Sequence, residues 1–200
     1  MHALARSASI VLVVAVCFAG RVAAQVECVD SSYAFVTFAG GKDRITIAPN
    51  GGFETLAGNG ITIHVYMRNC QGVARPGISG NDIVVWNVNL CLCSGGYHAD
   101  ADTDENGHTT FTGVIRGGGC VESLDVFGEG VHIATVPVKT NSPDDVSLSP
   151  CHVDMSEVGV LSSRFGNPSA YTICGDWNES GAIDAGEVAY LAAFLGAECQ

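Results

Sequence analysis

Residues Asp176–Glu187 read DWNESGAIDAGE, and their oxygen-bearing side chains recur at the spacing of a calcium-binding loop. Gly181 falls at position 6, where such a loop turns sharply, and Glu187 supplies the closing carboxylate at position 12. Carboxylate, amide and carbonyl oxygens are the ligands that a hard cation prefers. The sequence therefore predicts one bound Ca²⁺ held by six residues: Asp176, Asn178, Ser180, Ala182 through its backbone carbonyl, Asp184 directly or through water, and Glu187.

One residue limits the expected calcium affinity. Ser180 replaces the usual Asp or Asn, so we expect weaker binding than a fully acidic loop would give. The alternative is a turn rich in Asn, Gly and acidic residues that binds no metal.

The loop leads into a short amphipathic helix, and this pattern occurs twice. Apolar residues recur at helical spacing after Val188 and stop at Gly196. The segment Val153–Gly166, VDMSEVGVLSSRFG, aligns with Ile183–Gly196, IDAGEVAYLAAFLG, at a constant offset of 30 residues. In the first copy, loop positions 1, 3 and 5 fall on side chains that cannot bind a cation, which are Val146, Leu148 and Pro150. One calcium ion is therefore expected rather than two.

A duplicated loop and helix at the end of a secreted chain resembles a type I dockerin. The resemblance covers about the last quarter of the chain, and it predicts a small helical module over residues 141–200. It implies a cohesin-like protein partner. The loop positions that contact cohesin in that family read Ala185 and Gly186 in the second copy and Met155 and Ser156 in the first. The alternative is a calcium-stiffened cap that packs on its own neighbour.

The first 24 residues have the pattern of a secretory signal peptide. Arg6 precedes an apolar run over residues 8–19 that is too short for a membrane span, and the small residues 22–24 offer a cleavage site. No other segment reaches transmembrane length. We therefore expect a protein that is secreted or held at the cell surface.

The charge of the chain excludes some partners. The full sequence carries 9 basic and 21 acidic residues, and loss of Arg6 and Arg21 with the signal peptide changes the formal charge to 7 − 21 = −14. Nucleic acids and anionic membranes need a basic surface. The composition argues against both.

Eight of the nine cysteines follow the predicted cleavage site, and an even number in an oxidising compartment favours four disulfides. Cys174 with Cys199 is the expected pair, because the two flank the second loop and helix. Cys91 and Cys93 should find different partners, since residues two apart on a strand point to the same face. A zinc site is disfavoured, because no second matching Cys pair accompanies Cys-x-Cys.

Residues 25–140 alternate between apolar and polar positions, with turn residues at short intervals. Five segments are rich in β-branched and aromatic residues and read as strands: Tyr33–Phe38, Ile61–Met67, Ile83–Leu90, Thr109–Ile115 and Val131–Val138. Roughly seven short strands in such a segment predict an antiparallel β-sandwich. Trp86, inside an apolar strand, is expected in its core.

The strand and turn order over residues 55–138 resembles the bacterial immunoglobulin-like repeats of invasin-type adhesins. The phrases that carry the resemblance are ITIHVYMRNCQGVARPGISGNDIVVW (residues 61–86) and ADTDENGHTTFTG (residues 101–113). The resemblance implies a spacer or a binding surface. The run of residues 141–145, NSPDD, is expected to be a short linker to the C-terminal module.

One further acidic pattern allows two interpretations. Asp100, Asp102 and Asp104 alternate, so on a strand they would form a row beside His98 that could bind a second cation. The simpler interpretation is a solvated hairpin face closed by Asn106 and Gly107.

Motifs typical of catalysis are missing from the sequence, and the five histidines after the signal peptide are scattered. We therefore expect a secreted, non-catalytic, calcium-binding modular protein that acts in attachment or scaffolding. The alternatives are a carbohydrate-binding component of a polysaccharide-degrading system, with Tyr33, Tyr66, Tyr97 and Trp86 as aromatic candidates, or a purely structural cell-surface subunit.

Overall fold

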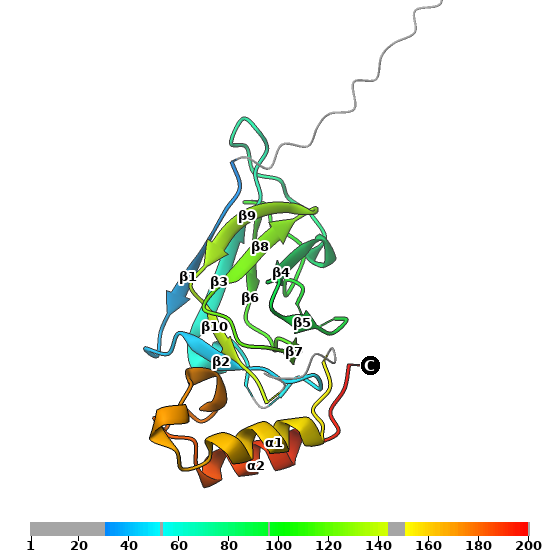
Figure 1. The fold of residues 1–200 in the computed structure, drawn as a ribbon. Helices are drawn as coiled ribbons and strands as arrows, with labels where there is room; N and C mark the ends of the chain where they lie inside the picture. Colours follow the sequence, from blue (N-terminus) through cyan, green and yellow to red (C-terminus); the bar gives the residue numbers. More distant parts are fainter. Residues whose placement is uncertain (1–30, 53, 96, 144–150, 200) are drawn as a thin grey trace, which may run out of the picture.

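The computed structural model describes residues 31–52, 54–95, 97–143 and 151–199. The predicted signal peptide, Cys28 and the first-copy loop positions 146, 148 and 150 lie outside these residues. The described chain is mainly β, with antiparallel sheets followed by two α-helices at its C-terminal end (Figure 1).

The first three-stranded sheet has the order β1-β3-β6 and is antiparallel throughout. Its strands are β1 (Tyr33–Phe38), β3 (Ile61–Tyr66) and β6 (His108–Phe111). In β3, Ile61, Ile63 and Val65 are fully buried, whereas the residues between them are partly exposed. This alternation is the period-2 pattern of the sequence, because successive side chains point to opposite faces of a strand.

The second three-stranded sheet has the order β4-β8-β9 and is also antiparallel. It consists of β4 (Ile83–Trp86), β8 (Leu124–Gly128) and β9 (Val131–Val136). The sequence did not predict β8, whose five residues LDVFG include an aspartate and a glycine, and it extended β4 too far. The chain turns between β8 and β9 at Glu129 and Gly130, both with positive φ.

Two shorter pairs complete the sheets. Strands β2 (Arg44–Thr46) and β10 (Lys139–Asn141) are parallel, and β5 (Cys91–Leu92) and β7 (Gly117–Gly118) are antiparallel. Short 3₁₀ turns in the described part of the chain lie at Ala57–Asn59, Gly80–Asp82, Pro168–Ala170 and Ile173–Gly175. The parallel pair departs from the all-antiparallel expectation.

One hydrophobic core joins the two three-stranded sheets. It contains inward residues of β3, β4, β6, β8 and β9, together with Ile45, Ile47, Leu56 and Met67. Trp86 is not part of it. Its side chain is 43% exposed and lies edge-on to Phe127, with ring centroids 6.2 Å apart. The core prediction for Trp86 is wrong because Ile83 and Val85 occupy the inward positions of β4, which turns Trp86 outward.

The C-terminal helices are two copies of one unit. Helices α1 (Met155–Arg164) and α2 (Ala185–Phe194) both begin with a capping box, formed by Asp154 with Glu157 and by Asp184 with Glu187. In each copy a glycine with positive φ, Gly166 or Gly196, lies two residues after the last helical residue. The predicted repeat at an offset of 30 is therefore present in the structure.

The disulfides differ from the expected pairing. The sulfur atoms join Cys91 to Cys151, Cys93 to Cys199, and Cys120 to Cys174. Pairing of Cys174 with Cys199 is therefore wrong. Separate partners for Cys91 and Cys93 are confirmed, and Cys70 is disulfide-bonded as well.

Each of these three disulfides ties the β region to the C-terminal segment.

The expected linker at residue 141 is wrong for its first three residues, because Asn141, Ser142 and Pro143 are buried. Asn141 also belongs to β10 and pairs in register with Thr46 of β2. Residues 144 and 145 lie outside the described residues.

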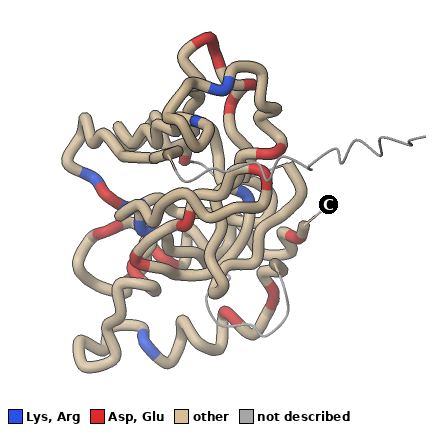
Figure 2. The backbone as a smooth tube through the Cα atoms, turned by 90° about the horizontal axis from the view of Figure 1, so that it is seen from above, with Lys and Arg blue, Asp and Glu red and all other residues tan. Residues whose placement is uncertain are grey.

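Acidic residues outnumber basic ones in the sequence, and their positions are distributed along the described backbone (Figure 2). Within that part of the chain, no helix combines the length and the apolar character needed to span a membrane.

Candidate metal site

Asp176 begins the predicted loop and is 1% exposed. Its Oδ1 accepts a hydrogen bond from the backbone N–H of Ser180 at 2.9 Å, and its Oδ2 accepts one from that of Gly181 at 2.8 Å. The chain therefore wraps around this carboxylate. Gly181 has φ of 85°, a left-handed conformation that glycine adopts without a steric penalty, which explains glycine at the turning position.

The next two candidate ligands bond to their own loop. Asn178 Oδ1 accepts from the backbone N–H of Ser180 at 2.9 Å, and Ser180 Oγ donates to the carbonyl oxygen of Ala182 at 3.1 Å. Ser180 Oγ and Ala182 O, at positions 5 and 7, are therefore neighbours in space. The hydrogen bond thus joins two of the predicted ligands.

Glu187 closes the loop and is fully buried. Its Oε1 lies 3.4 Å from the backbone nitrogen of Asn178, and its Oε2 accepts from the backbone N–H of Asp184 at 2.8 Å. Glu187 is thus held against both the early and the late part of the loop. The carboxylate of position 12 therefore contacts the backbone at positions 3 and 9.

Asp184 has a different task from the other carboxylates. Its Oδ1 accepts from the backbone N–H of Gly186 at 2.7 Å and caps α2. The helix terminus engages one oxygen of this carboxylate, so Asp184 would reach a cation through its other oxygen or through water.

Tyr171 is a member of the site that the sequence did not indicate. Its hydroxyl donates to Asp176 Oδ2 at 2.9 Å. Burial, and then the hydrogen bond to Asp176, raises the pKa of Tyr171 above its ordinary value of 10.0. The phenol therefore stays protonated and donates to the carboxylate at neutral pH.

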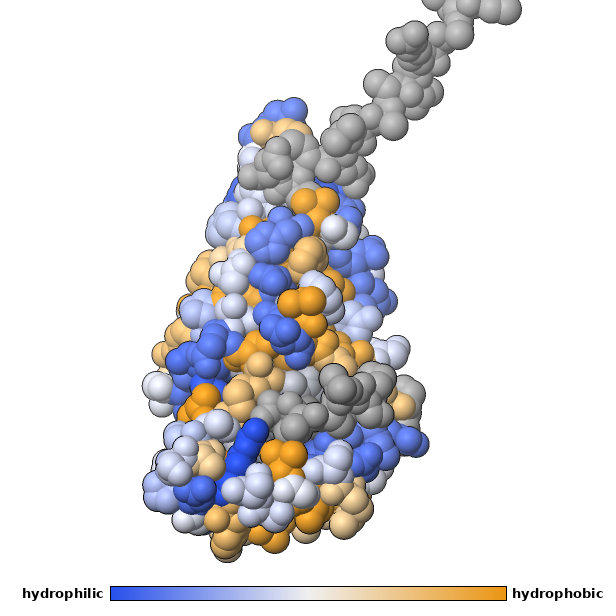
Figure 3. Space-filling view, in the orientation of Figure 1, coloured by the Kyte–Doolittle hydropathy of each residue, from blue (hydrophilic) through white to orange (hydrophobic). Residues whose placement is uncertain are grey.

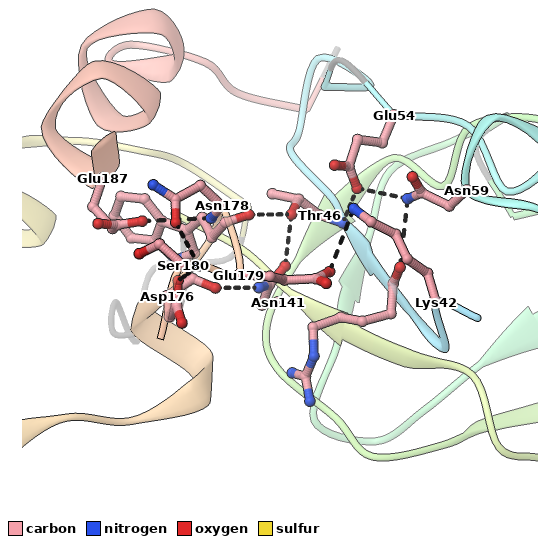
Figure 4. Close-up of polar contacts among 12 residues, drawn as sticks. Lys42, Thr46, Glu54, Asn59, Asn141, Asp176, Asn178, Glu179, Ser180 and Glu187 are labelled. Carbon is pink, nitrogen blue, oxygen red and sulfur yellow. Dashed lines mark hydrogen bonds and ion pairs between the residues drawn. The ribbon is translucent and has the colours of Figure 1, made fainter. Parts of the chain in front are cut away.

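Residues of the β region also contact the loop, as Figure 4 shows. Asn141 Nδ2 donates to the carbonyl oxygen of Asp176 at 3.0 Å, and Thr46 Oγ1 lies 3.0 Å from the carbonyl oxygen of Trp177. Lys42 Nζ lies 3.8 Å from Glu179 Oε1. No sequence pattern links residues 42, 46 and 141 to a loop at 176, because their proximity arises only when the chain folds.

The donor set fits a hard cation. Asp176 and Glu187 are two buried carboxylates, and among the described residues neither forms an ion pair with Lys, Arg or His. An ionised carboxylate in the interior is costly unless a positive charge or hydrogen bonds compensate it. Here the loop N–H groups and Tyr171 donate hydrogen bonds, and a bound cation would add the positive charge. Amide, hydroxyl and carbonyl oxygens lie beside them, as Ca²⁺ prefers.

Two other metal hypotheses fare differently. Ligand atoms of Cys93, Cys151 and Cys199 lie within 4.8 Å of one another, but these sulfurs belong to two neighbouring disulfides and are not thiolates. Asp100, Asp102 and Asp104 do not lie in a strand, and each accepts hydrogen bonds from a different neighbour: Thr110 and Thr112, Gly80, and His108 with Asn106. The aspartates stabilise the local turns.

Comparison with known proteins identifies no family. No family model matches the sequence, and no curated protein matches it. One solved structure with a detectable likeness is a type II cohesin–X-dockerin complex from Acetivibrio cellulolyticus, a C-terminal interface mutant. The match covers 83% of this chain and 97% of that chain, with 12% identity and a TM-score of 0.28. A likeness at this level does not establish a shared fold.

Proposed function

We propose that this chain is a secreted, non-catalytic protein that binds one Ca²⁺ in the loop Asp176–Glu187 and acts in extracellular attachment or scaffolding. The observation that carries the proposal is the pair of buried carboxylates, Asp176 and Glu187, at the two ends of a loop rich in oxygen ligands. When bound, the cation would neutralise these charges and order the loop. Asp176, Asn178, Ser180, Ala182 and Glu187 would hold it, with Asp184 acting directly or through water.

An exposed apolar groove between α1 and α2 supports the attachment role. The groove has a volume of about 370 Å³ and is lined by equivalent residues of the two copies, among them Val158 with Val188, Leu161 with Leu191, and Phe165 with Leu195. Phe165, Val188 and Leu195 are each almost half exposed. Figure 3 shows exposed hydrophobic surface at this end of the molecule. Apolar surface of this kind favours a protein partner.

The disulfides support secretion, and the sheets support the proposed β domain. Disulfides form and persist in oxidising compartments, and all three pairs described above are long-range. For the β region we propose an immunoglobulin-like sandwich. Its support is that two antiparallel three-stranded sheets contribute to one core.

Calcium titration calorimetry tests the proposal directly. Metal is first removed with a chelator, and the protein is then titrated beside the Glu187→Ala variant. We expect one calcium per chain in the unmodified protein and none in the variant. Equal binding by both proteins would refute the ligand set.

The attachment role needs its own measurement. Purified cohesin domains are immobilised and the chain is passed over them with calcium and with chelator, beside the Val188→Asp variant. Calcium-dependent binding that the variant loses would support attachment through the groove, whereas no binding to any cohesin would favour a structural cap.

A second function, carbohydrate binding, is favoured by exposed aromatic residues. Of the four candidates, Tyr33 and Tyr66 stack on each other with ring centroids 4.9 Å apart, so each hides one ring face. Trp86 is the stronger candidate, because it is exposed and pairs across the sheet with Asp125, whose carboxylate accepts from Thr135. An aromatic ring beside polar groups suits a sugar. Retardation of the chain by soluble polysaccharides in native gels, lost in Trp86→Ala, would support it; unchanged retardation would exclude this site.

A further inference from the structure

We propose that the calcium site is built by two parts of the fold, and that Thr46 and Asn141 of the β region position its first ligand. The inference rests on the proposed function and extends it to the β2–β10 pair. Calcium affinity would then depend on Thr46 and Asn141, which lie 130 and 35 positions before Asp176 (176 − 46 and 176 − 141).

The contact between the two parts is buried and polar. Asn141 is fully buried and Thr46 is 3% exposed, and the two residues stand opposite each other in the parallel ladder. Thr46 Oγ1 lies 2.8 Å from Asn141 Oδ1 and 3.0 Å from the carbonyl oxygen of Trp177. A hydroxyl has one hydrogen, so these two acceptors share it. Asn141 Nδ2 then donates to the carbonyl oxygen of Asp176 at 3.0 Å.

These hydrogen bonds hold the two peptide groups at the entry of the loop. The carbonyl oxygens of Asp176 and Trp177 are consecutive, so both peptide planes around Trp177 are fixed. Trp177 is itself buried in the second hydrophobic cluster, which also contains Ala48 just after β2. The backbone of Asp176 determines where its carboxylate points. Fixing it in advance removes an ordering cost from calcium binding.

The coupling must act in both directions. If the β2–β10 pair favours the calcium-binding form of the loop, calcium must stabilise the β2–β10 pair by the same factor. Calcium should therefore slow backbone hydrogen exchange in residues 45–47 and 140–141, which contain no proposed ligand.

Two matched pairs of variants test the inference by calorimetry. Asn141→Asp replaces the amide donor with an oxygen that repels the Asp176 carbonyl, and Thr46→Val removes the hydroxyl. Asn87→Asp is the control for the first, since Asn87 Nδ2 also donates to a main-chain carbonyl, that of Ser123 at 3.0 Å. Thr109→Val is the control for the second, since Thr109 Oγ1 donates to Ala101 O at 2.7 Å.

We expect roughly tenfold weaker calcium binding in Asn141→Asp and Thr46→Val, the effect of losing one buried hydrogen bond. The controls should bind as the unmodified chain does. Asn141→Asp adds negative charge near the site, which by Coulomb attraction alone would strengthen binding, so a loss identifies the positioning effect. If Asn141→Asp fails to fold, Thr46→Val and Thr46→Ser test the inference by themselves. Thr46→Ser retains the hydroxyl and should bind calcium as the unmodified chain does, whereas Thr46→Val should not.

The outcomes separate this inference from the proposed function. If the unmodified chain binds no calcium, or Glu187→Ala still binds it, the proposed function fails. If the unmodified chain binds one calcium and Glu187→Ala binds none, while Asn141→Asp and Thr46→Val bind with unchanged affinity, only the positioning role is overturned. Unchanged hydrogen exchange at residues 45–47 on calcium addition would overturn it as well.

Discussion

Glu157 and Glu187 hold the same place in two copies of one structural unit. Each accepts a hydrogen bond from the backbone N–H of its N-cap aspartate, at 2.7 Å and 2.8 Å, and both are buried. The copies are also joined reciprocally, since Gly166 N–H donates to Ile183 O at 3.0 Å and Gly196 N–H to Val153 O at 2.8 Å. The difference between the copies lies in the segment before each helix, where only the second has side-chain oxygens at loop positions 1, 3 and 5.

This equivalence provides a matched test of calcium binding. Glu187→Ala and Glu157→Ala each remove the same helix-capping contact, which costs about 1 kcal/mol of stability. We expect Glu187→Ala to abolish the rise in melting temperature caused by calcium, and Glu157→Ala to preserve it. Differential scanning calorimetry with calcium and with chelator makes the comparison. An equal loss in both variants would mean that calcium acts through the fold in general.

The two tryptophans should differ in their contribution to stability. Trp177 is 5% exposed, and its Nε1 donates to Cys174 O at 2.9 Å, whereas Trp86 faces solvent. We expect Trp177→Ala to lower the free energy of unfolding by about 3–5 kcal/mol. Trp86→Ala should lower it by less than about 1 kcal/mol. Urea unfolding followed by circular dichroism measures both, and a larger loss for Trp86→Ala would contradict its outward position.

Peptide mapping without reduction should recover the three disulfides as linked fragments. The bridges Cys91–Cys151, Cys93–Cys199 and Cys120–Cys174 connect residues 60, 106 and 54 positions apart. Each should stabilise the fold by about 2–4 kcal/mol, because it restricts the unfolded chain. Cys120→Ser with Cys174→Ser should lower the free energy of unfolding by this amount. A fragment linking Cys174 to Cys199 would contradict the structure.

Mild acid should weaken the first sheet through His64. Burial, followed by the charge of His108, lowers the pKa of His64 below 6.5, and the two ring nitrogens lie 3.1 Å apart. As the pH falls below 6.5, the unfolded chain binds a proton at His64 before the folded protein does. The stability present above pH 6.5 is therefore partly lost below it.

Urea unfolding at pH 7.5 and pH 5.5 measures this loss. His64→Gln should show a smaller decrease than the unmodified chain. His132→Gln, on the other three-stranded sheet, should retain the full decrease. An equal decrease in all three proteins would exclude His64 as its origin.

Features that arise between neighbours along the chain could be predicted from the amino-acid sequence. Alternation of apolar residues predicted β1 with the observed bounds and β3 within one residue, because a strand separates its faces by period alone. The same holds for the repeat, since Asp154, Asp184 and the glycines after each helix act on residues only a few positions away. Strand β8 was not predicted because its five residues include an aspartate and a glycine, which are uncommon in strands.

The disulfide pairing and the burial of the expected linker depend on residues that lie far apart in the sequence. Pairing of Cys174 with Cys120 rather than Cys199 follows from how the helices pack against the sheets, which local spacing does not encode. The first three residues of the expected short linker are buried, and Asn141 among them bonds to Thr46 and to the loop at Asp176. A buried polar group needs a partner wherever in the chain that partner lies, so these contacts exist only in the folded molecule.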